Sequence, residues 1–110
     1  MSFEELQAFV DSQDALFRSL KDTNQDERDQ IFGRTIKLGE EYGELCDEVL
    51  ASVGYQRKDK LNESEHDLEG EFADVVIATF LLAKAMHIDM RSALSKKIKK
   101  IKEKHNKQLE

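Results

Sequence analysis

Hydrophobic residues in the first part of the chain recur every three or four positions, which is the spacing of one face of an α-helix. Ser2 and Glu5, three residues apart, form a capping box just before this stripe. The pattern therefore predicts a helix over residues 3–20. Its apolar face consists of Phe3, Leu6, Val10, Phe17 and Leu20.

A second, longer stripe runs from Ile31 to Val49 with a repeat of about 3.5 residues. Thr23 is a candidate N-terminal cap, and Gly54 suits the position just after a helix end. We expect a helix over 25–52. Residues 55–63 are polar without periodicity, which predicts a loop.

Ser64 and Asp67 form another capping box, and they open a helix that we expect over 65–86. Its segment 75–83 (VVIATFLLA) is apolar around the whole circumference, as in a helix that is buried on most sides. Asp89 is expected to cap a basic C-terminal helix over about 90–107. This last helix should fray beyond about His105.

Composition supports a single all-α domain spanning residues 1–110. The 110 residues include no proline and no tryptophan, and 36% are charged against 39% hydrophobic, so the helices have a thin core. Cys46 is the single cysteine, which excludes an internal disulfide and predicts a reduced, cytoplasmic protein. The N-terminus lacks the pattern of a signal peptide, and no apolar run reaches about 18 residues, so neither export nor a membrane partner is expected.

The net charge of −6 is unevenly distributed. Residues 91–110 carry eight Lys or Arg against two acids, so the rest of the chain is strongly acidic. An acidic body repels phosphates unless cations intervene. We therefore expect no nucleic-acid polymer as a partner.

Two acidic segments contain no base. Five acids lie between Lys37 and Arg57, and six lie between Lys60 and Lys84. Solvated helices usually alternate charge signs, because opposite pairs at i,i+4 stabilise by about 0.2–0.5 kcal/mol. A solvated acidic face is the simplest alternative for each segment taken alone.

The position of these acids favours a metal site over a solvated face. Glu41 and Glu44 flank the apolar stripe of the second helix, while Glu71 and Asp74 continue the apolar seam of the third. A buried carboxylate without a partner lowers the stability of the fold by about 1–3 kcal/mol or more, unless it takes up a proton. Because neither segment contains a Lys or Arg, we expect a divalent cation that prefers oxygen ligands, Mg²⁺ or Mn²⁺.

The motifs EYGE at 41–44 and EFAD at 71–74, with the flanking segments KLGEEYGELCDEVL and EGEFADVVIATFLLAKAMHIDMRSALSKK, resemble the MazG-like nucleoside triphosphate pyrophosphohydrolases. The resemblance covers residues 31 to about 104. It implies an all-α enzyme, a MazG-like four-helix bundle, that cleaves (deoxy)nucleoside triphosphates into the monophosphate and pyrophosphate as nucleotide-pool housekeeping. By the same resemblance, the ligands of Mg²⁺ would be Glu41, Glu44, Glu71 and Asp74, and Glu40 would orient or deprotonate the attacking water.

Three lysines are candidates for contacts with substrate phosphates. Lys37 lies one turn before Glu41, and Lys97 and Lys104 share a flank of the last helix. Two positions depart from the family pattern. Ile101 stands where relatives often have Asn, and His87 stands where they commonly have Gly, so we expect His87 to interact with the C-terminal end of its helix.

Two alternative functions remain. Phosphoribosyl-ATP pyrophosphohydrolases share the helical scaffold, but their second motif helix usually carries a histidine that VVIATFLLA lacks. The chain could also be a non-catalytic helical module whose acidic patch binds a basic partner. Stabilisation by Mg²⁺ separates this module from an enzyme.

Self-association is expected to complete the bundle. The all-apolar segment 75–83 needs more cover than three other single-stripe helices provide, and the second helix has additional apolar residues, among them Phe32, Ile36, Leu50 and Val53. A homodimer or homotetramer would bury them. The family resemblance agrees, because MazG-like enzymes are dimers or paired dimers with nucleotide near subunit contacts.

Overall fold

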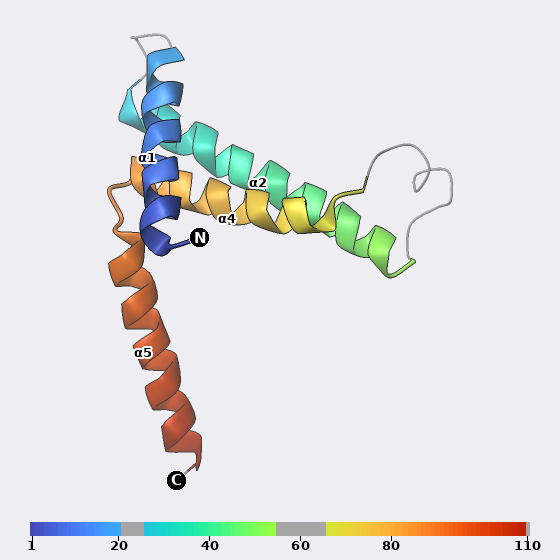
Figure 1. Cartoon of the computed structure of the whole chain (residues 1–110), viewed down its shortest axis with the longest axis vertical. Coiled ribbons are helices and arrows are strands. Elements are labelled where there is room, and N and C mark those ends of the chain that lie inside the picture. The colour runs from blue at the N-terminus through green and yellow to red at the C-terminus, as the bar shows by residue number, and fades with distance from the viewer. Residues whose placement is uncertain (21–25, 55–65, 110) are drawn as a thin grey trace.

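The computed structural model describes residues 1–20, 26–54 and 66–109, and its regular elements are all helices (Figure 1). In chain order they are α1 (Phe3–Leu20), α2 (Glu27–Ser52), α4 (Leu68–Ala85) and α5 (Met90–Leu109). The predicted all-α fold is confirmed. The expected loop over 55–63 lies outside the described residues. No described helix combines the length and the apolar character that crossing a bilayer requires.

Helices α2 and α4 form the centre of the fold, lying side by side in antiparallel directions (Figure 1). Helix α1 crosses them near the end of α4 and packs mainly against α4. Ring contact supports this packing, since the centroids of Phe3 and Phe80 are 5.9 Å apart. Val10 of α1 is fully buried where the helices meet.

The hydrophobic core within the described residues is small, as the composition predicted. Its buried members are Val10, Ala78, Phe80, Ala83 and Ala85. The segment 75–83 is less covered than expected for a helix that is buried on most sides, because Val76 remains 47% exposed. One chain therefore leaves part of the apolar surface of α4 open to solvent.

The boundaries of α1 and the end of α2 agree with the prediction. The Ser2 hydroxyl accepts a hydrogen bond from the Glu5 amide at 3.1 Å, as a capping box requires. Gly54 follows the end of α2 with φ +80°, a left-handed conformation that glycine adopts without strain.

The predicted starts of α2 and α4 are each a few residues too early. Helix α2 begins at Glu27, and Asp26 is its N-cap, accepting from the Asp29 amide at 2.9 Å. Helix α4 begins at Leu68 with Asp67 as its N-cap. The predicted caps Thr23 and Ser64 lie outside the described residues.

The cap of α4 depends on Gly70. The Asp67 carboxylate accepts from the Gly70 amide at 3.0 Å. A Cβ atom at position 70 would lie 2.0 Å from Asp67 Oδ2, so any larger residue would displace this carboxylate. The hydrogen bond between Gly70 and Asp67 caps the first turn of α4, which carries Glu71.

The turn between α4 and α5 contains His87 in a left-handed conformation, with φ +57°. The Ile88 amide donates to the Ala83 carbonyl at 2.9 Å, which closes the end of α4 in the manner of a Schellman motif. The imidazole of His87, at the C-terminal end of α4, also makes a contact with another helix. His87 Nε2 lies 3.2 Å from Glu27 Oε1 at the start of α2.

Helix α5 leaves the bundle and points away from α2 and α4 (Figure 1). From Ala93 to Gln108 every residue is exposed. The helix continues to Leu109, four residues beyond the point at which fraying was expected. At its start, Arg91 pairs with Glu4 of α1 and lies 4.6 Å from the ring centroid of Phe3.

Candidate active site

Three carboxylates meet where α2 and the beginning of α4 lie together. Glu41 and Glu44 are one helical turn apart on α2, and Glu71 lies in the first turn of α4. One oxygen from each side chain lies within 4.8 Å of the others. The antiparallel packing of α2 and α4 thus brings three of the four predicted metal ligands into one cluster, which we call the carboxylate cluster.

The carboxylate cluster is partly removed from water. Glu41 is only 8% exposed and Glu71 is half-buried, whereas Glu44 is exposed. Within the described part of the chain, Glu41 Oε2 and Glu71 Oε2 are buried without a hydrogen-bond partner. Burial, followed by the negative charges of neighbours such as Glu44 and Asp74, raises the pKa of Glu71 above its ordinary value.

These features fit a divalent cation. Buried carboxylate oxygens without donors are costly, and a hard cation satisfies several of them at once. The cluster offers only oxygen ligands, which suits Mg²⁺ or Mn²⁺ better than metals that prefer sulfur or imidazole. The donor set therefore fits a divalent cation that prefers oxygen ligands.

Asp74, the fourth predicted ligand, lies one turn after Glu71 and is exposed. It is not part of the group of three oxygens within 4.8 Å of one another, but it borders the same region, because it lines a pocket together with Glu41. Its charge acts on the pKa of Glu71. Asp74 thus lines the same pocket as one member of the carboxylate cluster.

Lys37 corrects one sequence-based expectation. The base-free segments indicated that the chain offers no cation of its own to these acids. In the structure, Lys37 Nζ lies 3.0 Å from Glu41 Oε1, reaching it from one turn earlier on α2. A hydrogen bond to Glu41 and the charge of that carboxylate raise the pKa of Lys37. The predicted phosphate-binding lysine is therefore paired with a predicted metal ligand.

Glu40 lies on the solvent side of the same turn. Its side chain is 61% exposed, and its carboxylate is 3.8 Å from Lys37 Nζ. This position leaves it open to water and adjacent to Glu41, as a residue that orients or deprotonates water requires.

A pocket of about 350 Å³ adjoins the carboxylate cluster. Residues of α1, α2 and α4 line it, and most of the surface they contribute is apolar. Lys37, Glu41 and Asp74 place charged groups at its wall, so a ligand could lie against apolar side chains with its charged end near the carboxylates. The lining residues are Phe17, Gly33, Arg34, Lys37, Glu41, Asp74, Ile77, Ala78 and Leu81.

A buried ion pair that the sequence analysis missed holds the three helices around this pocket. Arg34 Nη2 lies 2.7 Å from Asp14 Oδ1, and the two side chains are 8% and 10% exposed. Arg34 Nη1 also donates to the Leu81 carbonyl at 2.8 Å. The sequence did contain a signal, because Asp14 lies on the apolar stripe of α1 while Arg34 lies between Ile31 and Leu38 on that of α2.

The other two predicted lysines are not brought to the carboxylate cluster within one chain. Lys97 and Lys104 lie on α5, which points away from α2 and α4 (Figure 1). Both residues are exposed, as is Ile101. A contact between these lysines and the site would need α5 of a second chain.

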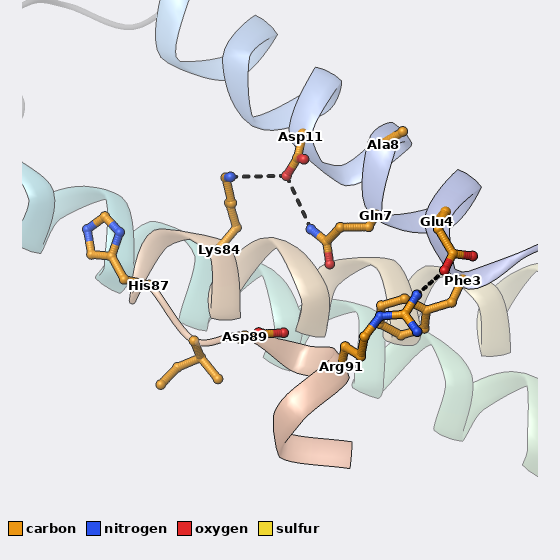
Figure 2. Close-up of a pocket in the computed structure, with 10 residues that line it drawn as sticks. Phe3, Glu4, Gln7, Ala8, Asp11, Lys84, His87, Asp89 and Arg91 are labelled. Atoms are coloured by element: carbon orange, nitrogen blue, oxygen red, sulfur yellow. Dashed lines mark hydrogen bonds and ion pairs between the residues drawn. The ribbon is translucent and has the colours of Figure 1, made fainter. Parts of the chain in front are cut away.

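A larger pocket of about 600 Å³ lies elsewhere, between α1 and the turn from α4 to α5 (Figure 2). Figure 2 shows that four of its charged side chains already form two pairs: Asp11 contacts Lys84 at 3.0 Å, and Glu4 contacts Arg91. Asp89, also in the lining, accepts a hydrogen bond from the Ser92 amide. These pairs leave little unmatched charge for a ligand. The smaller pocket, which shares residues with the carboxylate cluster, is the better candidate despite its size.

An all-helical bundle with clustered carboxylates beside an apolar pocket offers a place for a divalent cation and a place for a ligand. A family model described as the MazG nucleotide pyrophosphohydrolase domain matches residues 35–109, most of the chain. The chain therefore belongs to the MazG family, and membership supports nucleotide pyrophosphohydrolase activity in general. No curated protein and no solved structure matched the chain. Helix α1, which supplies Asp14 and Phe17, precedes the matched range.

Proposed function

We propose that the protein hydrolyses (deoxy)nucleoside triphosphates to the monophosphate and pyrophosphate in a reaction that depends on Mg²⁺. The observation that carries this proposal is the carboxylate cluster, whose oxygens lie within 4.8 Å of one another beside an apolar pocket. Family membership supports the reaction class. The substrate, the metal and the residue roles below are our proposals.

The carboxylates of Glu41, Glu44 and Glu71 hold the divalent cation, and Asp74 completes the set from the next turn of α4. When bound, the cation neutralises phosphate charge and activates water toward attack. The chain supplies the geometry, since Glu41 is held in the α2–α4 interface and Glu71 is positioned by the capped first turn of α4. This rigidity limits the movement needed to bind the cation.

Glu40 accepts the proton of the attacking water. Oxygen of that water forms a bond to the α-phosphorus, and the bond from this phosphorus to the α,β-bridging oxygen breaks, so pyrophosphate leaves. Lys37 contacts phosphate oxygens from the same chain. Lys97 and Lys104 do so from α5 of a partner chain, because their own helix points away from the cluster.

The pocket of about 350 Å³ accommodates the nucleoside part of the substrate. Phe17 lies at 36% exposure in its wall, and Ile77 and Leu81 contribute further apolar surface, which suits the faces of a base. The triphosphate then extends toward Lys37, Glu41 and Asp74. An acidic protein can thus bind a polyanionic substrate in two ways: the pocket takes the nucleoside, and the metal takes the phosphates.

The working form is a homodimer or homotetramer. Large apolar side chains remain exposed on both central helices, including Phe32 at 55%, Ile36 at 63% and Phe72 at 54%. Exposed apolar residues on this scale are typical of surfaces that another copy covers. We place the protein in the cytoplasm, where it removes unwanted triphosphates from the nucleotide pool.

Phosphorus NMR of reactions with a panel of canonical and modified triphosphates tests the proposal. Pyrophosphate and a monophosphate are the expected products, whereas orthophosphate and a diphosphate as primary products would reject α-phosphorus attack. Glu44→Gln should lower the rate at least about a hundredfold, since it removes one charged ligand. Asp74→Asn should also lower it. Glu27→Gln, at the exposed start of α2, should leave the rate unchanged.

Thermal unfolding separates an enzyme from a non-catalytic helical module. Millimolar Mg²⁺ should raise the melting temperature of the wild-type protein but not that of Glu44→Gln, because only a folded-state site gains from the ligand. A basic peptide that stabilised the protein where Mg²⁺ did not would favour the interaction module instead.

A further inference from the structure

Lys37 contacts both parts of the site that the proposed reaction uses, the metal ligands and the pocket. Its ammonium lies 3.0 Å from Glu41 Oε1 in the carboxylate cluster, and its side chain also lines the pocket of about 350 Å³. Among the described residues, Lys37 is the base that forms an ion pair with the carboxylate cluster. The same residue therefore touches the metal ligands and the space assigned to substrate.

The pair between Lys37 and Glu41 can be exchanged at little cost. The side chain of Lys37 is 60% exposed, and pairs with so much contact to water contribute little to stability. Its ammonium is a point charge on a flexible four-carbon stem, which can move by changing rotamers. Arg34, the other cation of the pocket wall, is fixed by contrast, because it is 8% exposed and bonded to Asp14 and Leu81.

Glu41 explains why a cation occupies this place before a metal does. Its carboxylate is nearly buried beside Glu44 and Glu71, and its Oε2 has no hydrogen-bond partner. Without Lys37, three carboxylates would face one another with no ion pair to a base among residues 1–20, 26–54 and 66–109. The ammonium satisfies one oxygen of Glu41 and leaves the other free for a cation.

We propose that Lys37 is an exchangeable counter-ion that holds the Glu41 carboxylate in the metal-free protein and moves to the substrate phosphates once a divalent cation binds the carboxylate cluster. This inference rests on the proposed function and adds an order of events to it. Lys37 opposes metal binding in the absence of phosphate and supports phosphate binding in its presence. Binding of metal and binding of triphosphate are thereby coupled through one side chain.

Two binding measurements on Lys37→Gln test the exchange. The first measures Mn²⁺ affinity without phosphate, from the electron paramagnetic resonance signal of the free ion. The variant should bind Mn²⁺ about two- to fivefold more tightly, since the competing ion pair is gone. The second measures inorganic tripolyphosphate binding by calorimetry at saturating Mn²⁺. Here the variant should bind about tenfold more weakly, because a charged phosphate contact is lost.

Lys84→Gln is the matched control. It removes the same charge from a lysine that pairs with Asp11 at 3.0 Å instead of with the carboxylate cluster, so both affinities should stay at the wild-type values. Lys37→Arg keeps the charge and should stay closer to wild type than Lys37→Gln in both measurements.

The results separate this inference from the proposed function. If Lys37→Gln did not tighten Mn²⁺ binding, or if Lys84→Gln tightened it equally, Lys37 would not be the counter-ion of the free site. Unchanged tripolyphosphate binding would show that its ammonium does not move to phosphate. If the wild-type protein binds Mn²⁺ and releases pyrophosphate, either of these variant results overturns the exchange and leaves the proposed function standing. A wild-type protein that binds no Mn²⁺ overturns both.

Discussion

Removing the Asp14 carboxylate should destabilise the protein more than removing the arginine with which it pairs. Asp14 of α1 forms ion pairs with Arg34 at 2.7 Å and with Arg18 at 3.1 Å. In Asp14→Ala, the guanidinium of Arg34 stays buried, and the Leu81 carbonyl is the partner that remains to it among the described residues. Leaving one charge of a buried pair unmatched costs about 3 kcal/mol or more, so we expect a loss of about 3 kcal/mol in the free energy of unfolding.

Arg34→Met should cost less, about 1.5 kcal/mol, because Asp14 keeps Arg18 as a partner and methionine fills most of the vacated volume. Arg18 is 35% exposed, which screens what remains of that pair. The expected order is therefore set by the asymmetry of the network, in which Asp14 has two arginines and Arg34 has one carboxylate.

Urea unfolding followed by far-ultraviolet circular dichroism measures these differences at one fixed protein concentration, because self-association would contribute to the apparent stability. Asp11→Asn is the control, because it removes a carboxylate from the same helix. The Asp11 side chain is 49% exposed, so its loss should lower the free energy of unfolding by less than about 0.5 kcal/mol. A cost for Asp14→Ala no larger than that of Arg34→Met would refute the asymmetry. A cost as small as that of the control would refute the burial argument.

Acid should narrow the difference between wild type and Asp14→Ala. Burial alone would raise the pKa of Asp14, but hydrogen bonds from Arg34 and Arg18 and their charges outweigh it and lower the pKa below its ordinary value of 3.8. For an acid with a lowered folded-state pKa, the stabilisation is present above 3.8 and is lost as the pH falls through the folded-state value. The two unfolding free energies should therefore converge only below pH 3.8.

Three further outcomes are expected. His87→Gly should stabilise the protein by about 1 kcal/mol in the same urea assay, since it relieves a left-handed conformation and loses only an exposed contact with Glu27; an unchanged or lower midpoint would contradict this. Glu71→Gln should raise the melting temperature of the metal-free protein at neutral pH, because a raised pKa means that the ionised carboxylate destabilises the fold above its ordinary value of 4.5; a gain that persisted well below that pH would point to another cause. Light scattering at micromolar concentration should give two or four times the mass of one chain, and a stable, active monomer would show that the exposed apolar residues need no partner.

Local patterns predicted the helices well because periodicity and capping are local properties. The helix over 3–20 and the glycine after α2 were both correct. The starts of α2 and α4 were wrong because each region contains two suitable caps three residues apart. Asp26 and Asp67 make the observed capping bonds, and the sequence alone could not rank them above Thr23 and Ser64.

The candidate site was predictable where it depends on helical spacing and harder to predict where it depends on packing. Glu41 and Glu44 share a face by their spacing, and the antiparallel partner supplies Glu71. The contacts of Lys37 with Glu41 and of Arg34 with Asp14 depend on side-chain conformation and on how α1 crosses the bundle. A charged residue at an apolar stripe position in each of two helices was the available signal for the buried pair.

The isolation of α5 has a consequence for its amide protons. Only its start contacts α1, and from Ala93 to Gln108 every residue is exposed, so this stretch owes its stability to local interactions. Lysines spaced three and four residues apart in it repel one another. Its backbone hydrogen bonds should then open often and exchange with deuterium quickly, while those of α2 and α4 exchange slowly. Helix α5 carries eight of the seventeen Lys and Arg residues. Its exchange rate should thus report when a second copy, or a substrate held by one, covers it.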